Sequence, residues 1–396
     1  MRKRLFGTLC GLVFLMNFGR TVFAPLLEPL TVAFGTDQAT IGILVSLVWL
    51  GTAIPRIPMG YILTHIPRYQ AVLATGVILA GSSAVIAFAQ SLVVLQLGTF
   101  LLGVASGAYF VAAVPLIAEL YPNAVGRTVG IHGTAAQLAA VLAPTIVVGI
   151  LLISSWRMVF VVLAVSAVIF SIVLATVVRG SRIADEAVPD HAFLSAVRAH
   201  WRLIATGLLM VGAAGFLWQG LFNFYVVYLN TVKGVSTTTA NLLLTVVFAA
   251  GLPAFWFGGR LADRLPIVPY ILAILTGFVI SVGALTYAGR LVALIIISVS
   301  IGYSIHSLFP ALDTYFLNSL PDESRGVAYA AFTGLSLLVE ANGTAAVGLL
   351  TEAGYQFNVV FLALASLVGC VVLVLAGLYL TDRLPGAHRE SRWSIE

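Results

Sequence analysis

The sequence predicts an all-α integral membrane protein with twelve transmembrane helices in two pseudo-symmetric bundles of six. Three observations support this fold class. Hydrophobic residues make up 60% of the chain and charged residues only 9%, whereas soluble domains carry about 25% charged residues. The apolar residues fall into stretches of about 20 or more, the length that crosses a bilayer as a helix. Short motifs also recur at equivalent places in the two halves.

The twelve apolar stretches follow one another with mostly short connections, so neighbouring helices are expected to be antiparallel. The first stretch follows a basic start that resembles a signal peptide, but its apolar run is too long for one and contains Arg20. We therefore interpret it as a retained span. The predicted spans are residues 8–28, 39–62, 70–90, 92–119, 127–152, 158–178, 203–229, 238–259, 267–288, 291–317, 325–350 and 357–380.

The longest polar interruption divides these spans into six and six. The predicted organisation is a six-helix bundle at 1–178, a cytoplasmic loop at 179–202, a second bundle at 203–381 and a cytoplasmic tail at 382–396. Within the loop, Phe193, Leu194, Val197 and Trp201 recur at helical spacing. This pattern indicates a short amphipathic helix on the inner membrane surface.

The placement of the basic residues predicts the orientation in the membrane. Of the 20 Lys and Arg residues, only Arg157, Lys233 and Arg290 fall on the outer side when the N-terminus is placed inside, and Arg20 and Arg56 fall within spans. This bias follows the positive-inside rule and places both termini in the cytoplasm, with the plasma membrane as the expected location. It also argues against nucleic acid as the partner of a chain with a net charge of +5.

Two motifs repeat between the halves. In each half a Pro comes just before a span that begins with an Arg. Pro122 precedes the span at 127–152, which begins with Arg127, and Pro321 precedes the span at 325–350, which begins with Arg325. The segment Gly60–Arg68 after the second span has its counterpart after the eighth, in Gly259-Arg-Leu-Ala-Asp-Arg. Two six-helix halves repeated in the same orientation are typical of one large class of secondary transporter.

These motifs resemble those of the major facilitator superfamily over nearly the whole chain. The 259–264 segment is similar to the signature loop of that family, while the first-half copy has Thr64 and His65 in place of the usual Asp and Arg. The resemblance implies a gating role, in which a carboxylate lies against a helix N-terminus and releases it on opening. Ordinary solvated loop charges are the alternative. The candidate gating residues follow from the resemblance and from the pairing of loop charges. They are Gly259, Asp263, Arg264, Gly60, Arg68, Glu119, Arg127 and Arg325.

Ionisable and amide residues are absent from some spans and concentrated in others. Spans three, six, nine and twelve contain no charged side chain and no His, so they are expected to face lipid. A charge at the bilayer centre costs about 2.5–3.5 kcal/mol, so charged residues in the other spans are expected to face a polar cavity or a partner.

Arg20 is the first candidate for substrate binding, with Asn17 one turn before it. An arginine binds carboxylate, phosphate or nitrate through two parallel hydrogen bonds and keeps its charge. The alternative is a structural ion pair with Glu340 or Asp313. Arg56, between two prolines, is either a second anion contact or gate residue, or a local structural cation that satisfies freed backbone carbonyls.

Glu340, Asp313 and His306 are the candidates for proton coupling. Glu340 lies in the middle of a span, where a carboxylate serves as a proton carrier, as a partner in a fixed ion pair or as a contact for a cationic substrate. Asp313 has a salt bridge with Arg264 as its alternative role, and His306 has that of a hydrogen-bonded packing residue.

Gln219 and Asn223 lie one turn apart among aromatic residues. They are expected to form part of a substrate-binding wall, with a lipid-facing aromatic belt as the alternative.

The sequence therefore predicts a secondary transporter that moves a small organic or inorganic anion by alternating access with proton coupling, and that works as a monomer in the bilayer. A proton-driven drug or metabolite exporter and a non-transporting membrane receptor are the alternatives. No enzyme activity, cofactor or metal is expected, because the sequence has no phosphate-binding loop, zinc-protease motif or nucleophile elbow.

Overall fold

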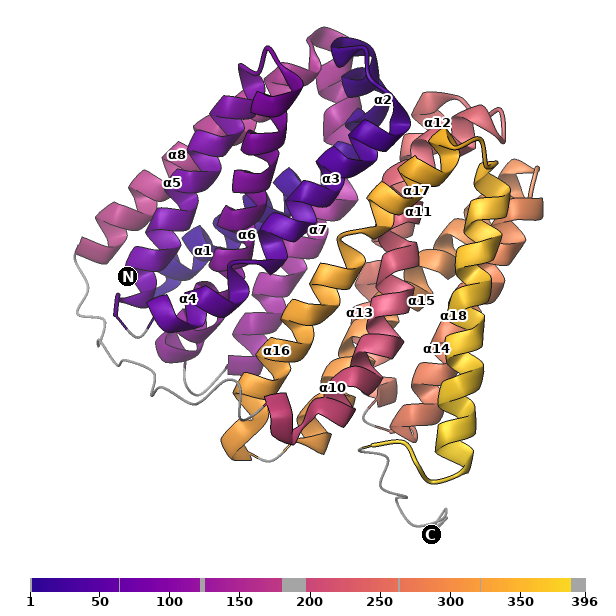
Figure 1. The fold of residues 1–396 in the computed structure, drawn as a ribbon. Helices are drawn as coiled ribbons and strands as arrows, with labels where there is room; N and C mark the ends of the chain where they lie inside the picture. The colour runs from indigo at the N-terminus through magenta and orange to yellow at the C-terminus, as the bar shows by residue number, and fades with distance from the viewer. Residues whose placement is uncertain are drawn as a thin grey trace. The chain divides into compact units, whose positions relative to one another are not determined.

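The protein is described by a computed structural model that covers residues 2–63, 65–121, 125–179, 197–262, 264–320 and 322–385. Every regular element in these ranges is helical (Figure 1). The first half consists of α1 (Arg2–Thr21), α2 (Phe23–Phe34), α3 (Gln38–Ala53), α4 (Arg56–Ile62), α5 (Arg68–Ala87), α6 (Leu92–Leu120), α7 (Val125–Ile153) and α8 (Trp156–Arg179).

The second half begins with a composite helix made of α10 (Trp201–Gly207), a π-helical turn η1 (Leu208–Gly212) and α11 (Ala213–Thr231). The elements that follow are α12 (Thr237–Ala249), α13 (Gly251–Ala262), α14 (Ile267–Tyr287), α15 (Leu291–Ser319), α16 (Asp322–Glu340), α17 (Gly343–Glu352) and α18 (Phe357–Leu380). The amphipathic helix predicted for 191–202 falls mainly outside the described residues; of it, Val197–Ala199 forms a helical turn.

The helix ends follow from local sequence. Asp37 caps α3 by accepting a hydrogen bond of 2.7 Å from the backbone N–H of Thr40, and Ser91 caps α6 in the same way through the N–H of Val94. Such caps satisfy N–H groups that have no partner within the helix. Gly35 ends α2 with φ 57°, a left-handed conformation that glycine adopts without steric penalty.

Within the described residues, ten helices are long and apolar enough to cross a membrane, and α1 with α2 forms an eleventh span if this pair, bent by 47°, is counted as one. The all-α membrane fold is therefore confirmed, but the count of twelve is not met by this criterion. The predicted span 39–62 differs, because it is divided into the 16-residue α3 and the 7-residue α4. Pro55 lies at this division, and a proline removes a backbone donor from a helix.

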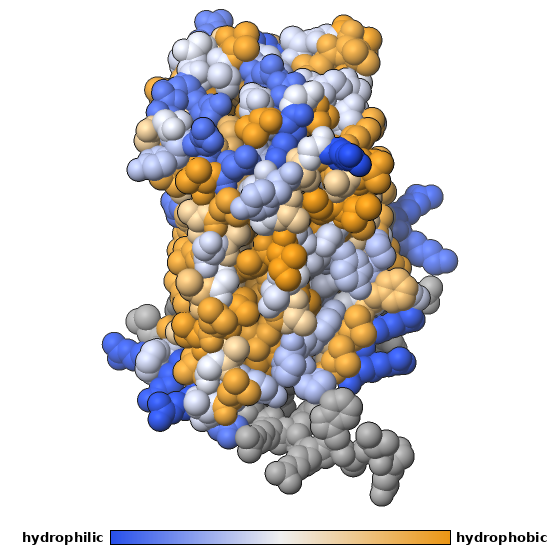
Figure 2. All heavy atoms as spheres, turned by 90° about the vertical axis from the view of Figure 1, so that its right-hand side faces the viewer, coloured by the Kyte–Doolittle hydropathy of each residue, from blue (hydrophilic) through white to orange (hydrophobic). Residues whose placement is uncertain are grey.

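Apolar side chains that the spans expose are consistent with a lipid surface. The helices that contain the four charge-free spans expose Val77 of α5, Ile172 of α8, Ile280 of α14 and Leu373 of α18 by 58 to 73%. Figure 2 shows apolar side chains gathered over the middle of one face and polar side chains toward its two ends. This distribution agrees with the prediction that these four spans face hydrocarbon.

The chain forms two compact units. Unit 1 consists of Met1–Asp190, Gln219–Thr245 and Ala341–Tyr355, and unit 2 of His191–Trp218, Val246–Glu340 and Gln356–Glu396. The division passes through α11 and α12 and between α16 and α17. The predicted bundles at 1–178 and 203–381 describe the sequence repeat and stay a prediction.

In unit 1, α6 packs against α3 and α5, α5 packs against α8, and α1 packs against α7. The second-half helix α17 packs closely against α3 (Figure 1). Small residues permit this approach: a Cβ atom at Gly42 would lie 2.8 Å from the carbonyl oxygen of Thr344, and one at Gly348 would lie 2.5 Å from that of Gln38. Close backbone contact through small residues is how membrane helices commonly associate.

In unit 2, α15 packs against α13 and α14, and α14 packs against α18. The rings of Phe316 in α15 and Phe332 in α16 stack with their centroids 3.8 Å apart. In the part of α11 that precedes Gln219, Trp218 contacts His306 of α15 and Gly215 lies against Glu340 of α16.

Candidate substrate and coupling sites

Arg20 lies in the last turn of α1 and is only 8% exposed. Its Nη2 atom donates a hydrogen bond of 2.5 Å to Oδ1 of Asn17. The guanidinium also lies over the rings of Trp49 in α3 and Phe110 in α6, 5.0 and 5.1 Å from their centroids. Hydrogen bonding and cation–π attraction together fix the orientation of the cation.

No carboxylate that the structure describes in unit 1 forms an ion pair with Arg20. Its Nε atom is buried without a hydrogen-bond partner. Arg56, the first residue of α4, lies close enough to repel Arg20 electrostatically. Because a buried cation is destabilising unless a counter-charge accompanies it, this arrangement favours an anion beside Arg20. An ion pair of Arg20 with Glu340 or Asp313, which belong to unit 2, stays a prediction.

Asn17 connects Arg20 to α7. Its Nδ2 atom donates to the carbonyl oxygen of Ala136 at 2.6 Å, while its Oδ1 atom accepts from Arg20. Tyr109 of α6 contacts α1 nearer its start, where its hydroxyl donates a hydrogen bond of 2.7 Å to the carbonyl oxygen of Leu9. The same hydroxyl lies 3.0 Å from Nε2 of His132 in α7. His132 is therefore a hydrogen-bonded packing residue between α6 and α7, and Asn17 is a positioning residue for the cation.

The amides of Gln219 and Asn223 are buried in unit 1. Nδ2 of Asn223 donates to the backbone oxygen of Gln219 at 2.8 Å and to Oγ1 of Thr344 in α17 at 3.0 Å. The bond to Thr344 joins α11 to α17, and both amides are buried, so the alternative of a lipid-facing belt does not describe these two residues. The side-chain oxygens of both amides are buried without a partner, and binding of substrate by these residues stays a prediction.

Glu340 is the last residue of α16 and is 6% exposed. The chain turns at Ala341 and Asn342 before α17 begins, so the carboxylate lies at a break in the span. It packs directly against Gly215 of α11, where a Cβ atom would overlap the carboxyl group. Interrupted helices are where transporters of this architecture place coupling ions.

The other two coupling candidates have defined partners in unit 2. Asp313 accepts a hydrogen bond from the hydroxyl of Tyr329; among the described residues it forms no ion pair with Arg264. Nδ1 of His306 lies 2.7 Å from the carbonyl oxygen of Gly302. Four aromatic rings surround this imidazole, those of Trp218, Phe248, Phe255 and Phe309. The surroundings of His306 match those of a packing residue.

Of the predicted gating residues, Arg68 and Glu119 form an ion pair that joins the start of α5 to the end of α6. The ion pair joins two residues that the sequence assigns to the gate, while their role in gating stays a prediction. Asp263 lies outside the described residues, and Arg264 is exposed just after α13. The other four gating candidates lie in helices, but the structure does not describe their side chains. They are Gly60, Arg127, Gly259 and Arg325.

The aromatic partners of Arg20 were not identified from the sequence. Trp49 and Phe110 lie in apolar runs that contain many aromatic residues, and nothing in their spacing separates them from lipid-facing rings. Gly215 was missed for a similar reason, since its contact with Glu340 depends on the packing of two distant segments.

Comparison with known proteins places this architecture in a family. The profile of the Major Facilitator Superfamily matches residues 9–341. An uncharacterised MFS-type transporter of Bacillus subtilis, YwfA, is 24% identical over 378 residues, which are 92% of this chain and 90% of that protein. A riboflavin transporter of Saccharomyces cerevisiae is 28% identical over 155 residues, 38% of this chain and 30% of that protein.

Solved structures show the same fold. A bacterial homologue of the human lysosomal transporter Spinster, in an inward-facing and occupied conformation, superposes with a TM-score of 0.78 at 16% identity, covering 99% of this chain and 98% of that one. The same kind of homologue in an inward-facing and unoccupied conformation gives a TM-score of 0.75 at 17% identity, covering 100% and 99%. Matched along nearly its whole length by fold and by sequence profile, this chain belongs to the Major Facilitator Superfamily of membrane transporters.

Proposed function

We propose that this protein is a proton-coupled secondary transporter of a small organic or inorganic anion. The observation that carries the proposal is the buried Arg20, held by Asn17 and two aromatic rings, close to Arg56 and not paired with a described carboxylate of unit 1. The buried guanidinium of Arg20 attracts an anion, and the fork of an arginine suits a carboxylate, phosphate or nitrate group.

Coupling to protons is assigned to Glu340, with Asp313 as the second carrier. Both carboxyl groups are in unit 2, and Glu340 lies at the break between α16 and α17. The protonation of a buried carboxyl group depends on its surroundings, so proton uptake would accompany a change in the packing around Glu340.

Alternating access is supported by the composition of unit 1, which joins parts of the second-half helices α11, α12 and α17 to the first half of the chain. By the positive-inside rule this end of the spans faces outward, both termini are cytoplasmic, and the plasma membrane is the site of action. Arg68 with Glu119, and the 259–264 loop, would serve as gates at the opposite end, and the protein would work as a monomer.

The proposal is tested by a thermal-shift panel on purified protein in detergent. Carboxylates, phosphate esters and nitrate are compared with hydrophobic cations, on wild type, Arg20→Ala and Arg157→Ala. Arg157 is a matched control because it also lies over an aromatic ring, that of Trp156, and donates to a backbone oxygen. A ligand present at 100 times its Kd stabilises the protein by about 2.7 kcal/mol.

We expect one class of anion to stabilise wild type and Arg157→Ala but not Arg20→Ala. Stabilisation by hydrophobic cations that persists in Arg20→Ala would overturn the proposal and favour the drug or metabolite exporter.

A further inference from the structure

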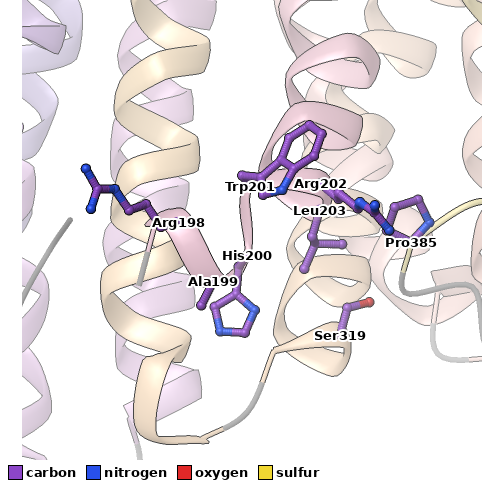
Figure 3. Close-up of a pocket in the computed structure, with 8 residues that line it drawn as sticks. All are labelled: Arg198, Ala199, His200, Trp201, Arg202, Leu203, Ser319 and Pro385. Atoms are coloured by element: carbon purple, nitrogen blue, oxygen red, sulfur yellow. The ribbon is translucent and has the colours of Figure 1, made fainter. Parts of the chain in front are cut away.

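Unit 2 contains a cavity that plays no part in the proposed transport site. It has a volume of about 400 Å³ and lies where three segments meet, namely the start of α10, the end of α15 and the stretch after α18. The side chains that matter are those of Arg198, His200, Trp201, Arg202, Ser319 and Pro385 (Figure 3). A volume of this size is in the range of ligand-binding pockets.

The polar lining of this cavity is basic. Two arginines and a histidine line it, together with the hydroxyl of Ser319, and no carboxylate does among the described residues. Figure 3 shows Arg202 extending beside Pro385, with Arg198 on the opposite side of His200 and pointing away from it. Both arginine side chains are exposed, so that of Arg198 is free to rotate toward a ligand. Such a lining attracts a group with a fixed negative charge.

The location of the cavity indicates that the anion comes from the membrane. Trp201 is the first residue of a membrane-crossing segment, Trp201–Thr231, and is 58% exposed. Tryptophan is enriched at the level of the lipid headgroups. Further along the same span Leu209 is 45% exposed, so the span carries exposed apolar surface beyond its first residues. A ligand that combines a phosphate with acyl chains would contact both features.

The cation of Arg202 is itself placed at this boundary. Its guanidinium lies 5.7 Å from the centroid of the Trp201 ring. Ser319, which ends α15, belongs to the same end of the spans as Trp201, because α10 begins there and α15 finishes there. By the positive-inside rule this is the cytoplasmic end, where anionic lipids interact with basic side chains next to membrane-spanning helices.

We propose that this cavity binds the phosphate headgroup of an anionic phospholipid in the inner leaflet. Arg202 and the Ser319 hydroxyl donate hydrogen bonds to the phosphate oxygens, Arg198 adds a second charge, and the acyl chains extend along the exposed surface that begins at Trp201. The site lies on residues separate from Arg20 and Glu340, so it stands or falls independently of the proposed transport function.

The test is native mass spectrometry of the full chain in detergent with added phosphatidylglycerol or phosphatidylcholine, whose headgroups differ in net charge. The variants are Arg198→Gln/Arg202→Gln and the control Arg290→Gln. Arg290 is an exposed arginine that precedes α15, whereas Ser319 ends it. These positions are roughly 43 Å apart at about 1.5 Å per residue.

We expect wild type and Arg290→Gln to retain phosphatidylglycerol in preference to phosphatidylcholine. Each arginine near a membrane surface contributes about fivefold to anionic lipid binding, so the double variant should bind about 25-fold more weakly. A thermal melt in phosphatidylcholine shows whether the double variant is folded; if it is not, Ser319→Ala replaces it and is expected to show a smaller loss.

Equal retention of phosphatidylglycerol by a folded double variant and by wild type would overturn the proposal. So would an equal affinity of wild type for the two lipids. A third arm uses inorganic phosphate and glycerol phosphate in the thermal-shift assay. Stabilisation by these soluble compounds, lost in the double variant and without selective lipid binding, would assign the cavity to a soluble anion and overturn the lipid proposal.

Discussion

Arg20 and Asn17 divide the tasks of charge and position at the candidate substrate site. The arginine supplies a cation that cannot lose its proton under physiological conditions. The asparagine uses one end of its amide to hold that cation and the other to bind the backbone of α7 at Ala136. A substrate that displaces Oδ1 of Asn17 from the guanidinium would therefore act directly on a side chain that is hydrogen-bonded to α7.

Gly215 offers a test of Glu340 at the scale of single residues. A Cβ atom at this position would overlap the carboxyl group of Glu340, so Gly215→Ala displaces the proposed proton carrier. Overpacking of this kind costs about 1–3 kcal/mol, and we expect proton-driven uptake in liposomes to fall about tenfold. Ligand binding measured by thermal shift should remain, because the partners that the structure describes for Arg20 do not include Gly215 or Glu340.

Gly212→Ala is the matched control, since a Cβ atom there would lie at ordinary contact distance, 3.4 Å from Leu208 and 3.5 Å from Val339. Equal rates for the two variants would remove the reason for assigning a positioning role to Gly215.

At the residue scale the sequence predicted the ionisable side chains but not their neighbours. Arg20, Glu340 and Asp313 are charged residues in otherwise apolar runs. Because placing a charge in a membrane costs free energy, such residues can be recognised as candidate functional residues from the sequence alone. Partners such as Trp49 and Tyr329 are distant in the chain, and only the packing of helices brings them to these charges.

At the scale of elements, the contact of α3 with α17 is the feature most open to experiment. A Cβ atom at Gly42 or Gly348 would meet a backbone oxygen, and a backbone cannot move aside as a side chain does. We expect Gly42→Ala and Gly348→Ala each to lower the melting temperature, because overpacking costs about 1–3 kcal/mol of stability. We also expect both variants to slow transport. Thermal melts and uptake assays measure both effects.

Gly81→Ala in α5 provides the comparison, because nothing lies within 4 Å of its added methyl group. Replacing a helical glycine in open space stabilises by about 0.5–1 kcal/mol. The change in stability should therefore be negative for Gly42→Ala and Gly348→Ala and positive for Gly81→Ala. A loss of stability at Gly81 as large as that at Gly42 would show that helix contact is not the cause.

The cap of α3 predicts a dependence of stability on pH. The backbone N–H of Thr40 donates to Asp37 and holds the pKa of that carboxyl below its ordinary value of 3.8. A lowered pKa in the folded state contributes stability above the unfolded pKa, and that contribution is lost as the pH falls through the folded pKa. Asp37→Asn keeps a side chain that caps well but does not titrate.

We therefore expect the difference in melting temperature between wild type and Asp37→Asn to be constant near neutral pH. Below pH 3.8 wild type should lose stability relative to the variant. A difference that stays flat down to pH 3 would mean that the cap contributes nothing measurable to stability.

Most spans were predictable as elements, while their interruptions were not. Long apolar runs fix the approximate position of a helix, as at 357–380, which the structure gives as Phe357–Leu380. The breaks after Ala53 and Glu340 depend on how neighbouring helices satisfy the backbone groups that are released. Proline indicates the first of these breaks, but no proline lies at the second.

For the whole molecule, the distribution of basic residues predicts how the chain crosses the membrane. Alkaline phosphatase fused after Lys233, between α11 and α12, should be active in a bacterial host, since it reaches the outer side. Green fluorescent protein fused after Glu396 should fluoresce, since it stays in the cytoplasm. The opposite pattern would invert the proposed orientation and with it the assignment of the lipid cavity to the inner leaflet.

At this scale the family was predictable from the sequence, because motifs such as that at 259–264 have counterparts at equivalent places in the two halves. The division of the chain into compact units was not. Unit 1 takes α17 and part of α11 from the second half, and a sequence repeat contains no information about which end of a helix packs against the other half.

The π-helical turn at Leu208–Gly212 has a consequence for how this chain can vary. Bonding from residue i to i+5 accommodates one residue more than the α-helical pattern needs. Deleting one residue there would let the span close as a continuous α-helix, and the side chains beyond it would stay on nearly the same faces, because the turn already absorbs the extra residue. Gly215 would then remain against Glu340. A one-residue deletion at this turn is therefore expected to preserve both the face presented at the proposed coupling carboxylate and the length of membrane that the span covers, whereas a deletion elsewhere in the same span would turn the side chains beyond it by about 100°.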